Sequence, residues 1–248
     1  MVIKKRANHL FCLIYLVTTY FSTFIIFFPL IIPLSIAGFF SKKAWHLFGN
    51  FFYVLNKWTL DLQPFKNRNF CLEGLETLKG RKVLLVSNHR SNLDVFLLLS
   101  CFKNLRLASK SELFNVPILG IMMSLTKQIK FKRANLNEFY KSLEIGKESL
   151  NSGDPTLFFP EMTRCPHKFK GTQRFHLYPF KMAKDEGAYV YPIVIKGSDE
   201  VWPKGYMGID FRKDVSIKLL NPLNSKDYDS AFELAKEVRN LIEKELNQ

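Results

Sequence analysis

The chain has 248 residues, of which 47% are hydrophobic and 23% charged, and its formal net charge at pH 7 is +14. This length suits one domain of ordinary size with an N-terminal appendage, and the positive charge predicts anionic ligands such as lipid headgroups. Nucleic acid is excluded as a partner, because the basic residues lie beside long apolar runs and no nucleic-acid-binding motif is present. Neither a disulfide framework nor a zinc site is expected, because no CxxC pair occurs among the four cysteines, which are Cys12, Cys71, Cys101 and Cys165. A reduced, cytoplasm-facing domain is therefore the simpler expectation.

Residues 10–40 contain no charged side chain, and these 31 residues exceed the roughly 20 that one helix needs to cross a bilayer. The run is too long and too aromatic for a cleaved signal peptide. Basic residues flank both of its ends and predict that both stay on the cytoplasmic side, as in a re-entrant helical hairpin. A single tilted helix is the alternative. Pro29 and Pro33 are expected to interrupt the helix, and residues 1–60 are predicted to form a membrane-associated helical segment carrying six positive and no negative side chains.

Residues 44–60 repeat large apolar side chains at spacings of three and four, among them Trp45, Phe48 and Trp58, which predicts a helix with an aromatic face. That face either lies in a membrane interface or packs on the following domain.

Beyond residue 61 short apolar runs alternate with amphipathic segments, which predicts an α/β domain at residues 61–248 with a largely parallel sheet flanked by helices. Asn135 with Glu138 predicts the start of one helix and Asp229 the start of the last one. Ligands of such sheets bind at the carboxyl ends of strands. Strands are expected at residues 82–87, 105–109, 128–131, 156–159, 189–195 and 215–220.

The polar run at residues 87–94 follows the first strong strand and contains His89 and Asp94. Five residues along a helix turn by about 140° net, so the two side chains would not share one helical face, and His89 is better placed in the loop. If Ser91 is the N-cap, Asp94 can reach back to the imidazole, and His89 can then take a proton from a hydroxyl. The alternative is a plain capping box with His89 as an ordinary loop residue.

The sequence NHRSNLD at residues 88–94 resembles the NHxxxxD motif of the glycerol-phosphate and lysophosphatidate acyltransferase superfamily. Three further motifs follow in the family's order, and the resemblance covers about residues 82–196. The later motifs are KFKR at residues 130–133, FPEMTR at 159–164, close to the family's FPEGTR, and YPIVI at 191–195.

The resemblance implies that His89 and Asp94 are catalytic and that Arg133 and Arg164 bind the phosphate of a lipid acceptor. It also implies that Glu161 aligns the glycerol or orients Arg164. Thr163 and Lys181 complete the implied substrate-binding set, although the sequence after Arg164 does not reproduce the family's lysine–glycine continuation.

Met162 stands where the family generally has glycine, so a backbone conformation or close approach that glycine allows is in question. Cys165 could act as a nucleophile in its basic setting, but a histidine base makes one unnecessary. His167 and His176 have no carboxylate or cysteine neighbours at metal-ligand spacing, so no metal is expected.

The resemblance implies a membrane-bound enzyme of phospholipid biosynthesis, with its catalytic domain facing the cytoplasm and no cofactor. Acyl-CoA or acyl carrier protein would supply the acyl group, and the sn-2 hydroxyl of 1-acyl-glycerol-3-phosphate would accept it to form phosphatidic acid. Glycerol-3-phosphate or another lysophospholipid is the alternative acceptor. A membrane-anchored lipid-binding protein without catalytic activity is the alternative of another class.

Overall fold

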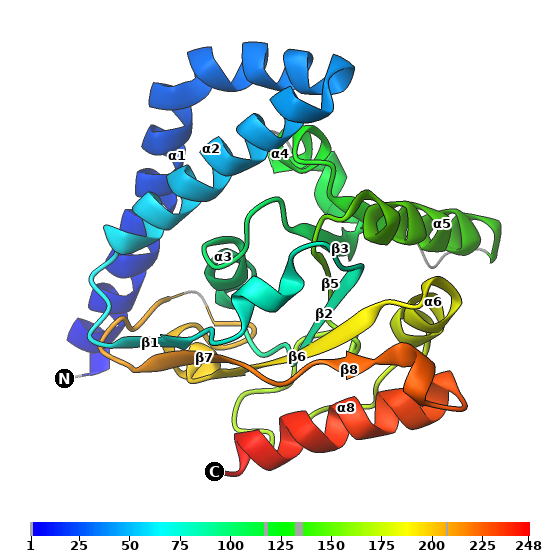
Figure 1. The fold of residues 1–248 in the computed structure, drawn as a ribbon. Helices are drawn as coiled ribbons and strands as arrows, with labels where there is room; N and C mark the ends of the chain where they lie inside the picture. The colour runs from blue at the N-terminus through cyan, green and yellow to red at the C-terminus, as the bar shows by residue number, and fades with distance from the viewer. Residues whose placement is uncertain (1, 117–118, 132–135, 207) are drawn as a thin grey trace.

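The computed structural model describes residues 2–116, 119–131, 136–206 and 208–248, and Figure 1 shows helices arranged around one sheet. The helices are α1 (Val2–Phe40), α2 (Lys42–Asp61), α3 (Leu93–Leu99), α4 (Leu119–Leu125), α5 (Leu136–Ser152), α6 (Tyr178–Glu186), α7 (Ser198–Val201) and α8 (Ala231–Leu246). The strands are β1 (Arg68–Cys71), β2 (Val83–Ser87), β3 (Arg106–Lys110), β4 (Ile129–Phe131), β5 (Thr156–Phe158), β6 (Tyr189–Lys196), β7 (Val215–Leu219) and β8 (Leu223–Asn224).

The strands form one sheet in the order β1-β7-β6-β2-β5-β3-β4, with β8 paired to β6. The pairing is parallel except where β6 meets β7 and β8. This arrangement confirms the predicted α/β fold with a mostly parallel sheet flanked by helices. All six predicted strands are present within one residue of their expected bounds, while β1 and β8 were not predicted.

The central strand β2 is buried on both faces, as expected for a parallel strand covered on both sides. Val83 and Leu85 belong to a core cluster that also contains residues of α3. Leu84 and Val86 belong to a second cluster, made with residues of α6 and α8. Because successive side chains of a strand point to opposite faces, β2 joins the two halves of the core.

The helix α1 runs through Pro29 and Pro33 without ending, so the expected interruption does not occur, although Figure 1 shows that the helix is bent. A proline inside a helix removes one hydrogen bond and favours such a bend. The hairpin expected within residues 10–40 is not formed, because these residues all belong to α1. Among the residues that the structure describes, no helix is both long and apolar enough to span a membrane, so the expected crossing is not supported.

The helix α2 confirms the prediction for residues 44–60 and packs along α1 and against α3. On its aromatic face Trp45 and Phe48 are buried, whereas Trp58 is 46% exposed.

One chain of hydrogen bonds connects the N-terminal helices to α3. The Tyr20 hydroxyl donates to Asn56 Oδ1 at 3.1 Å, and Asn56 Nδ2 donates to the carbonyl of Phe96 at 3.1 Å. The Tyr20 ring also lies against the Phe96 ring, with 4.9 Å between centroids. Asn56 is only 5% exposed, so this amide depends on its protein partners for hydrogen bonds.

Two predicted helix starts are displaced by one residue. Asn92 rather than Ser91 precedes α3, yet the Ser91 hydroxyl still accepts a hydrogen bond from the Leu93 amide at 3.1 Å. Ser230 rather than Asp229 caps α8, because its side chain accepts from the Glu233 amide. The predicted Asn135 cap lies outside the described residues.

Candidate active site

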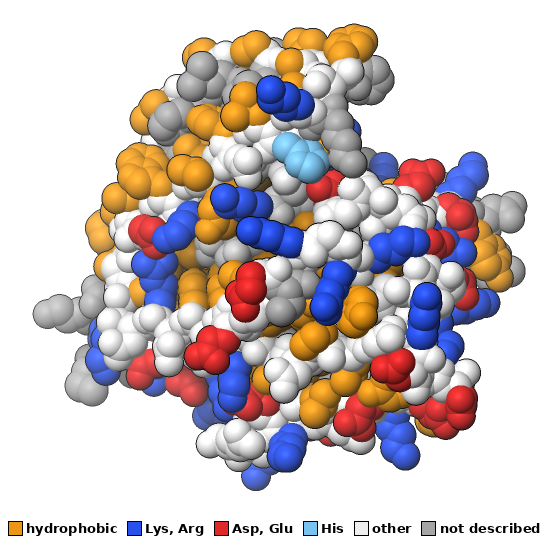
Figure 2. All heavy atoms as spheres, viewed as in Figure 1, with side chains coloured by type: hydrophobic (Ala, Val, Ile, Leu, Met, Phe, Trp, Pro, Cys, Tyr) orange, Lys and Arg blue, Asp and Glu red, His pale blue; other side chains and the backbone are white. Residues whose placement is uncertain are grey.

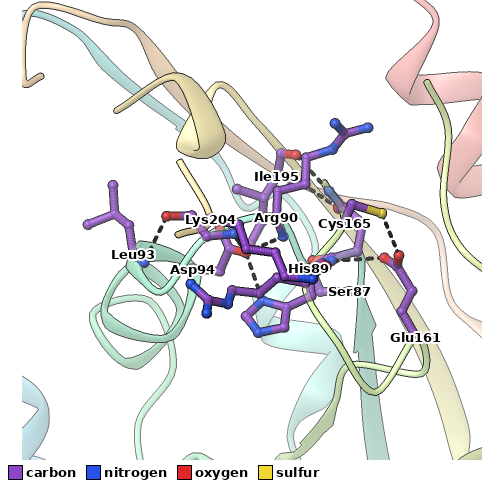
Figure 3. A network of polar contacts seen from close by, with 12 residues as sticks. Ser87, His89, Arg90, Leu93, Asp94, Glu161, Cys165, Ile195 and Lys204 are labelled. Atoms are coloured by element: carbon purple, nitrogen blue, oxygen red, sulfur yellow. Dashed lines mark hydrogen bonds and ion pairs between the residues drawn. The ribbon is translucent and has the colours of Figure 1, made fainter. Parts of the chain in front are cut away.

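The loop after β2 brings His89 and Asp94 together, as Figure 3 shows, with 2.9 Å between His89 Nδ1 and Asp94 Oδ2. Asp94 lies in the first turn of α3 and is completely buried. Its Oδ2 also accepts from the backbone amides of Arg90 at 2.7 Å and Ser91 at 2.8 Å. These donors hold the carboxylate in place independently of the histidine, so the geometry matches the relay that the sequence predicts.

The contact with Asp94 determines which ring nitrogen of His89 is free for chemistry. An ionised carboxylate only accepts hydrogen bonds, so Nδ1 carries the proton and Nε2 presents its lone pair. The ring also stacks on Phe159, with 4.0 Å between centroids and 16° between planes. His89 is thus oriented from two sides, as a general base requires.

Asn88, the first residue of the NHxxxxD motif, ties the catalytic loop to the neighbouring strand β6. Its Nδ2 donates to the Ile195 carbonyl and its Oδ1 accepts from the Ile195 amide, both at 2.8 Å. The side chain is 1% exposed and pairs with the backbone as another strand would. Sequence reasoning assigned no role to Asn88, although an amide directly after a buried strand was the available signal.

Glu161 is 3% exposed and holds the backbone of His89. Its Oε1 accepts from the His89 amide at 3.0 Å, and its Oε2 accepts from the Gln173 amide at 2.9 Å. The Cys165 thiol donates to the same Oε2 at 2.8 Å. Because these donors occupy both oxygens, the Glu161 carboxylate holds neighbouring groups of the protein in place and is not open to solvent.

Cys165 holds the catalytic loop through its backbone as well, since its amide donates to the His89 carbonyl at 2.7 Å. Burial raises the pKa of the thiol to about 11, and the hydrogen bond to the Glu161 carboxylate acts in the same direction. A neutral thiol is a hydrogen-bond donor and a poor nucleophile, which agrees with assigning no covalent role to Cys165.

Met162 adopts the left-handed backbone conformation with φ = 59°. Glycine reaches this region without steric cost, whereas other residues pay about 1 kcal/mol. A sharp turn directly after Glu161 therefore explains both why the family generally has glycine at this position and why the methionine here is strained. The Met162 side chain packs against the core cluster that contains Leu84 and Val86.

The predicted acceptor-binding residues are less tightly held. Lys204 Nζ donates to the Arg164 carbonyl at 2.6 Å and lies 3.5 Å from the Thr163 hydroxyl. The Arg164 side chain is half-buried, and its guanidinium makes no hydrogen bond or ion pair among the described residues. Lys181 is exposed on α6, and no described contact joins its side chain to the catalytic loop. Arg133 lies outside the described residues.

Lys204 was not singled out from the sequence. It lies about 40 residues from Thr163 and Arg164 along the chain, and only the folded structure brings it to them. The structure thus joins His89, Asp94 and Glu161 into one network and leaves Thr163 and Arg164 at its edge.

The fold and this network define an α/β protein with a hydrogen-bonded histidine–aspartate pair, an arrangement that can support general-base chemistry. The sequence profile of the family described as Acyltransferase matches residues 69–196, more than half of the chain. The chain belongs to this family.

Curated relatives carry a more specific name. A chloroplastic 1-acyl-sn-glycerol-3-phosphate acyltransferase from Arabidopsis thaliana is 31% identical over 180 residues, covering 71% of this chain and 49% of the relative. A 1-acyl-sn-glycerol-3-phosphate acyltransferase from Pseudomonas aeruginosa is 32% identical over 134 residues, covering 54% of this chain and 51% of the relative. The chain spans about half the length of these relatives.

A solved structure supports the fold. The crystal structure of the 1-acyl-sn-glycerophosphate acyltransferase from Thermotoga maritima superposes with a TM-score of 0.81, covering 97% of this chain and 95% of that one. Sequence identity between the two is 22%, so this likeness speaks for the fold alone.

Proposed function

We propose that the chain transfers a fatty acyl group from acyl-CoA or acyl carrier protein to the sn-2 hydroxyl of 1-acyl-glycerol-3-phosphate. The product is phosphatidic acid, and the reaction belongs to phospholipid biosynthesis. The observation that carries the proposal is the contact of 2.9 Å between His89 and Asp94 in a chain of the Acyltransferase family. The names of its relatives support the choice of acceptor.

In the proposed reaction His89 Nε2 accepts the proton of the acceptor hydroxyl while the oxygen attacks the thioester carbonyl. Asp94 stabilises the resulting imidazolium through the Nδ1 hydrogen bond. When the tetrahedral intermediate collapses, the carbon–sulfur bond breaks and the imidazolium proton passes to the departing thiolate. The ester and the free thiol form in one direct transfer, without an acyl-enzyme.

For the acceptor, we assign the phosphate to Arg164 and Arg133, whose guanidinium groups can bind phosphate oxygens in pairs. Thr163 and Lys181 are further candidates for this headgroup. The occupied oxygens of Glu161 favour a positioning role, in which it holds the His89 backbone. Direct alignment of the glycerol by Glu161 stays a prediction.

We further propose that the protein works at the cytoplasmic face of a membrane, where its lipid substrate resides. Figure 2 shows hydrophobic side chains gathered over α1 and α2. On α1, Phe11 is 68% exposed, Ile26 is 64% exposed and Phe40 is 82% exposed. An exposed apolar surface of this kind favours contact with lipid or with another protein.

The direct test incubates the purified full chain with lysophosphatidate and acyl-CoA and follows thiol release and phosphatidate by mass spectrometry. The His89→Ala variant should lose activity by about 10²- to 10⁴-fold, because the base is gone. His176→Ala is the matched control, since that histidine stacks on Tyr178 and has no assigned role in catalysis.

Turnover that survives His89→Ala would contradict the mechanism. Turnover only with glycerol-3-phosphate or another lysophospholipid would correct the acceptor. Lipid binding without turnover across a panel of acceptors and donors would favour the non-catalytic alternative.

A further inference from the structure

A pocket of about 490 Å³ lies beside the catalytic loop, at the carboxyl end of β6. Its walls come from the segment after Arg164, from the turn after β6 and from Arg90, the residue that follows His89. The volume falls within the range of about 300–1,000 Å³ that is typical of small-ligand sites. The mechanism above gives this pocket no role.

The pocket is lined by more positive than negative side chains. Arg90, Lys168, Lys196 and Lys213 face it, against the carboxylates of Asp199 and Glu200. The ion pairs of two of these lysines are long: Lys213 lies 3.6 Å from Glu200, with both side chains at least half exposed, and Lys196 lies 3.8 Å from Glu245. Lys168 is exposed and has no ion pair among the described residues. Cations of this kind remain available to an anionic ligand.

Arg90 connects the pocket wall to the catalytic loop. Its guanidinium donates to the backbone carbonyls of Phe169 at 3.0 Å and Gly171 at 2.9 Å and lies 3.6 Å from Asp199. Arg90 directly follows His89 in the chain, and Figure 3 shows both residues in the same polar network, so one wall of the pocket begins one residue from the base.

Phe169 supplies an aromatic surface at the same place. Its side chain lines the pocket and is 42% exposed, although its backbone is fixed by Arg90. An exposed aromatic ring beside several lysines is the combination that binds nucleotides, since the ring stacks on a base and the cations bind phosphates. A lysolipid headgroup has a phosphate but no base, so the ring favours a nucleotide.

We propose that this pocket binds the phosphorylated adenosine end of a coenzyme A thioester. The pantetheine arm then extends past Arg90 and presents the thioester to His89. This assignment rests on the proposed acyl transfer, and it selects coenzyme A over a carrier protein as the donor. The other phosphate available to the pocket is that of the acceptor, and the experiment distinguishes the two.

The test measures equilibrium binding of coenzyme A to the full chain by titration calorimetry. The Lys168→Asn/Lys213→Gln double variant removes two pocket charges, with asparagine chosen because Lys168 has φ = 64°. Its Kd should rise about tenfold, the loss expected for two phosphate contacts. Dephospho-coenzyme A, which lacks the 3′-phosphate, should show a smaller rise. Lys141→Gln/Lys236→Gln makes the same charge change on exposed parts of α5 and α8 and should leave Kd unchanged.

A second pair of variants tests the stacking. Phe169→Ala should raise the Kd of coenzyme A about fivefold and leave that of phosphopantetheine, which has no base, unchanged. Phe232→Ala is its control, because Phe232 is 63% exposed on α8.

An unchanged Kd in the pocket variants would overturn the proposal, and so would an equal rise in the control variants. A raised KM for lysophosphatidate with an unchanged Kd for coenzyme A would assign the pocket to the acceptor. If coenzyme A binds as expected but no acceptor is acylated, the donor pocket stands and the proposed transfer fails. If the protein acylates the acceptor normally but the pocket variants leave the Kd of coenzyme A unchanged, the proposed transfer stands and the donor pocket fails.

Discussion

The surroundings of His89 and those of Arg164 meet at the same end of the sheet but differ in how firmly they are held. The ring of His89 is bonded to Asp94, its amide to Glu161 and its carbonyl to Cys165. Arg164 is held by its backbone carbonyl, while its guanidinium makes no hydrogen bond or ion pair among the described residues. Under the proposed mechanism, this difference means that the groups assigned to proton transfer are preorganised before substrate arrives. The side chain assigned to the acceptor phosphate would become fixed only when the ligand binds.

Replacing Asp94 by asparagine should have the largest effect. The amide nitrogen would donate to Nδ1 and favour the wrong tautomer, so kcat should fall by about 10²- to 10⁴-fold. The KM for acceptor should change little. Steady-state acylation kinetics, with circular dichroism to verify folding, measure this. A folded Asp94→Asn protein with kcat within threefold of the parent would show that the firmly held surroundings of His89 are not the catalytic part of the site.

Arg164→Ala should have the next largest effect, on binding rather than on rate. Removal of one charged phosphate contact should raise the KM for lysophosphatidate by about 10- to 100-fold, with a smaller change in kcat. Arg164→Lys should recover only part of the loss, because lysine lacks the planar fork. A loss confined to kcat would place Arg164 with the catalytic network instead.

Cys165 tests whether a single donor on Glu161 matters to the histidine. Cys165→Ala removes the thiol hydrogen bond and should cost about 1 kcal/mol of unfolding free energy, with activity reduced several-fold. Cys165→Ser keeps a donor and should restore most of both. Thermal melting and initial rates measured together check this. Equal behaviour of the alanine and serine variants would mean that the thiol contributes by packing alone.

Met162 should give the smallest effect. Met162→Gly removes the left-handed strain but also the side-chain packing and restricts the unfolded chain less, so stability should stay within about 1 kcal/mol. Met162→Val places a β-branched residue in the same conformation and should cost about 1–2 kcal/mol. Chemical denaturation measures both. A strongly stabilised valine variant would contradict the assigned backbone conformation.

The sequence predicted the central architecture because its signals are local. Six apolar runs correspond to strands within one residue, since a buried strand needs little beyond its own side chains to be recognised. β1 and β8 were missed because the first is polar and short and the second has two residues. Both depend on pairing with distant strands rather than on a pattern of their own.

In the candidate site, too, only the contact set by local sequence was predictable. The spacing of His89 and Asp94 in a loop before a helix gave their contact correctly, because five residues determine it. The hydrogen bonds of Asn88 to Ile195 and of Cys165 to Glu161 could not be predicted from the sequence. The first joins two motifs that are distant along the chain, and the second depends on the turn after Glu161. The structure shows the contact but not the chemistry, so the roles assigned to the site residues stay predictions: His89, Asp94, Arg133, Glu161, Thr163, Arg164 and Lys181.

The hydrogen-bond chain from Tyr20 through Asn56 to Phe96 makes the N-terminal helix part of the support of the active site. Phe96 lies two residues after Asp94 in α3, so α1 supports the helical turn that carries the Asp94 carboxylate. Trimming residues 2–40 to obtain a more tractable protein would expose the Asn56 amide and strip apolar cover from the core at Leu16. A protein shortened in this way would lack part of the support of its active site, so low activity in it would say little about the intact chain.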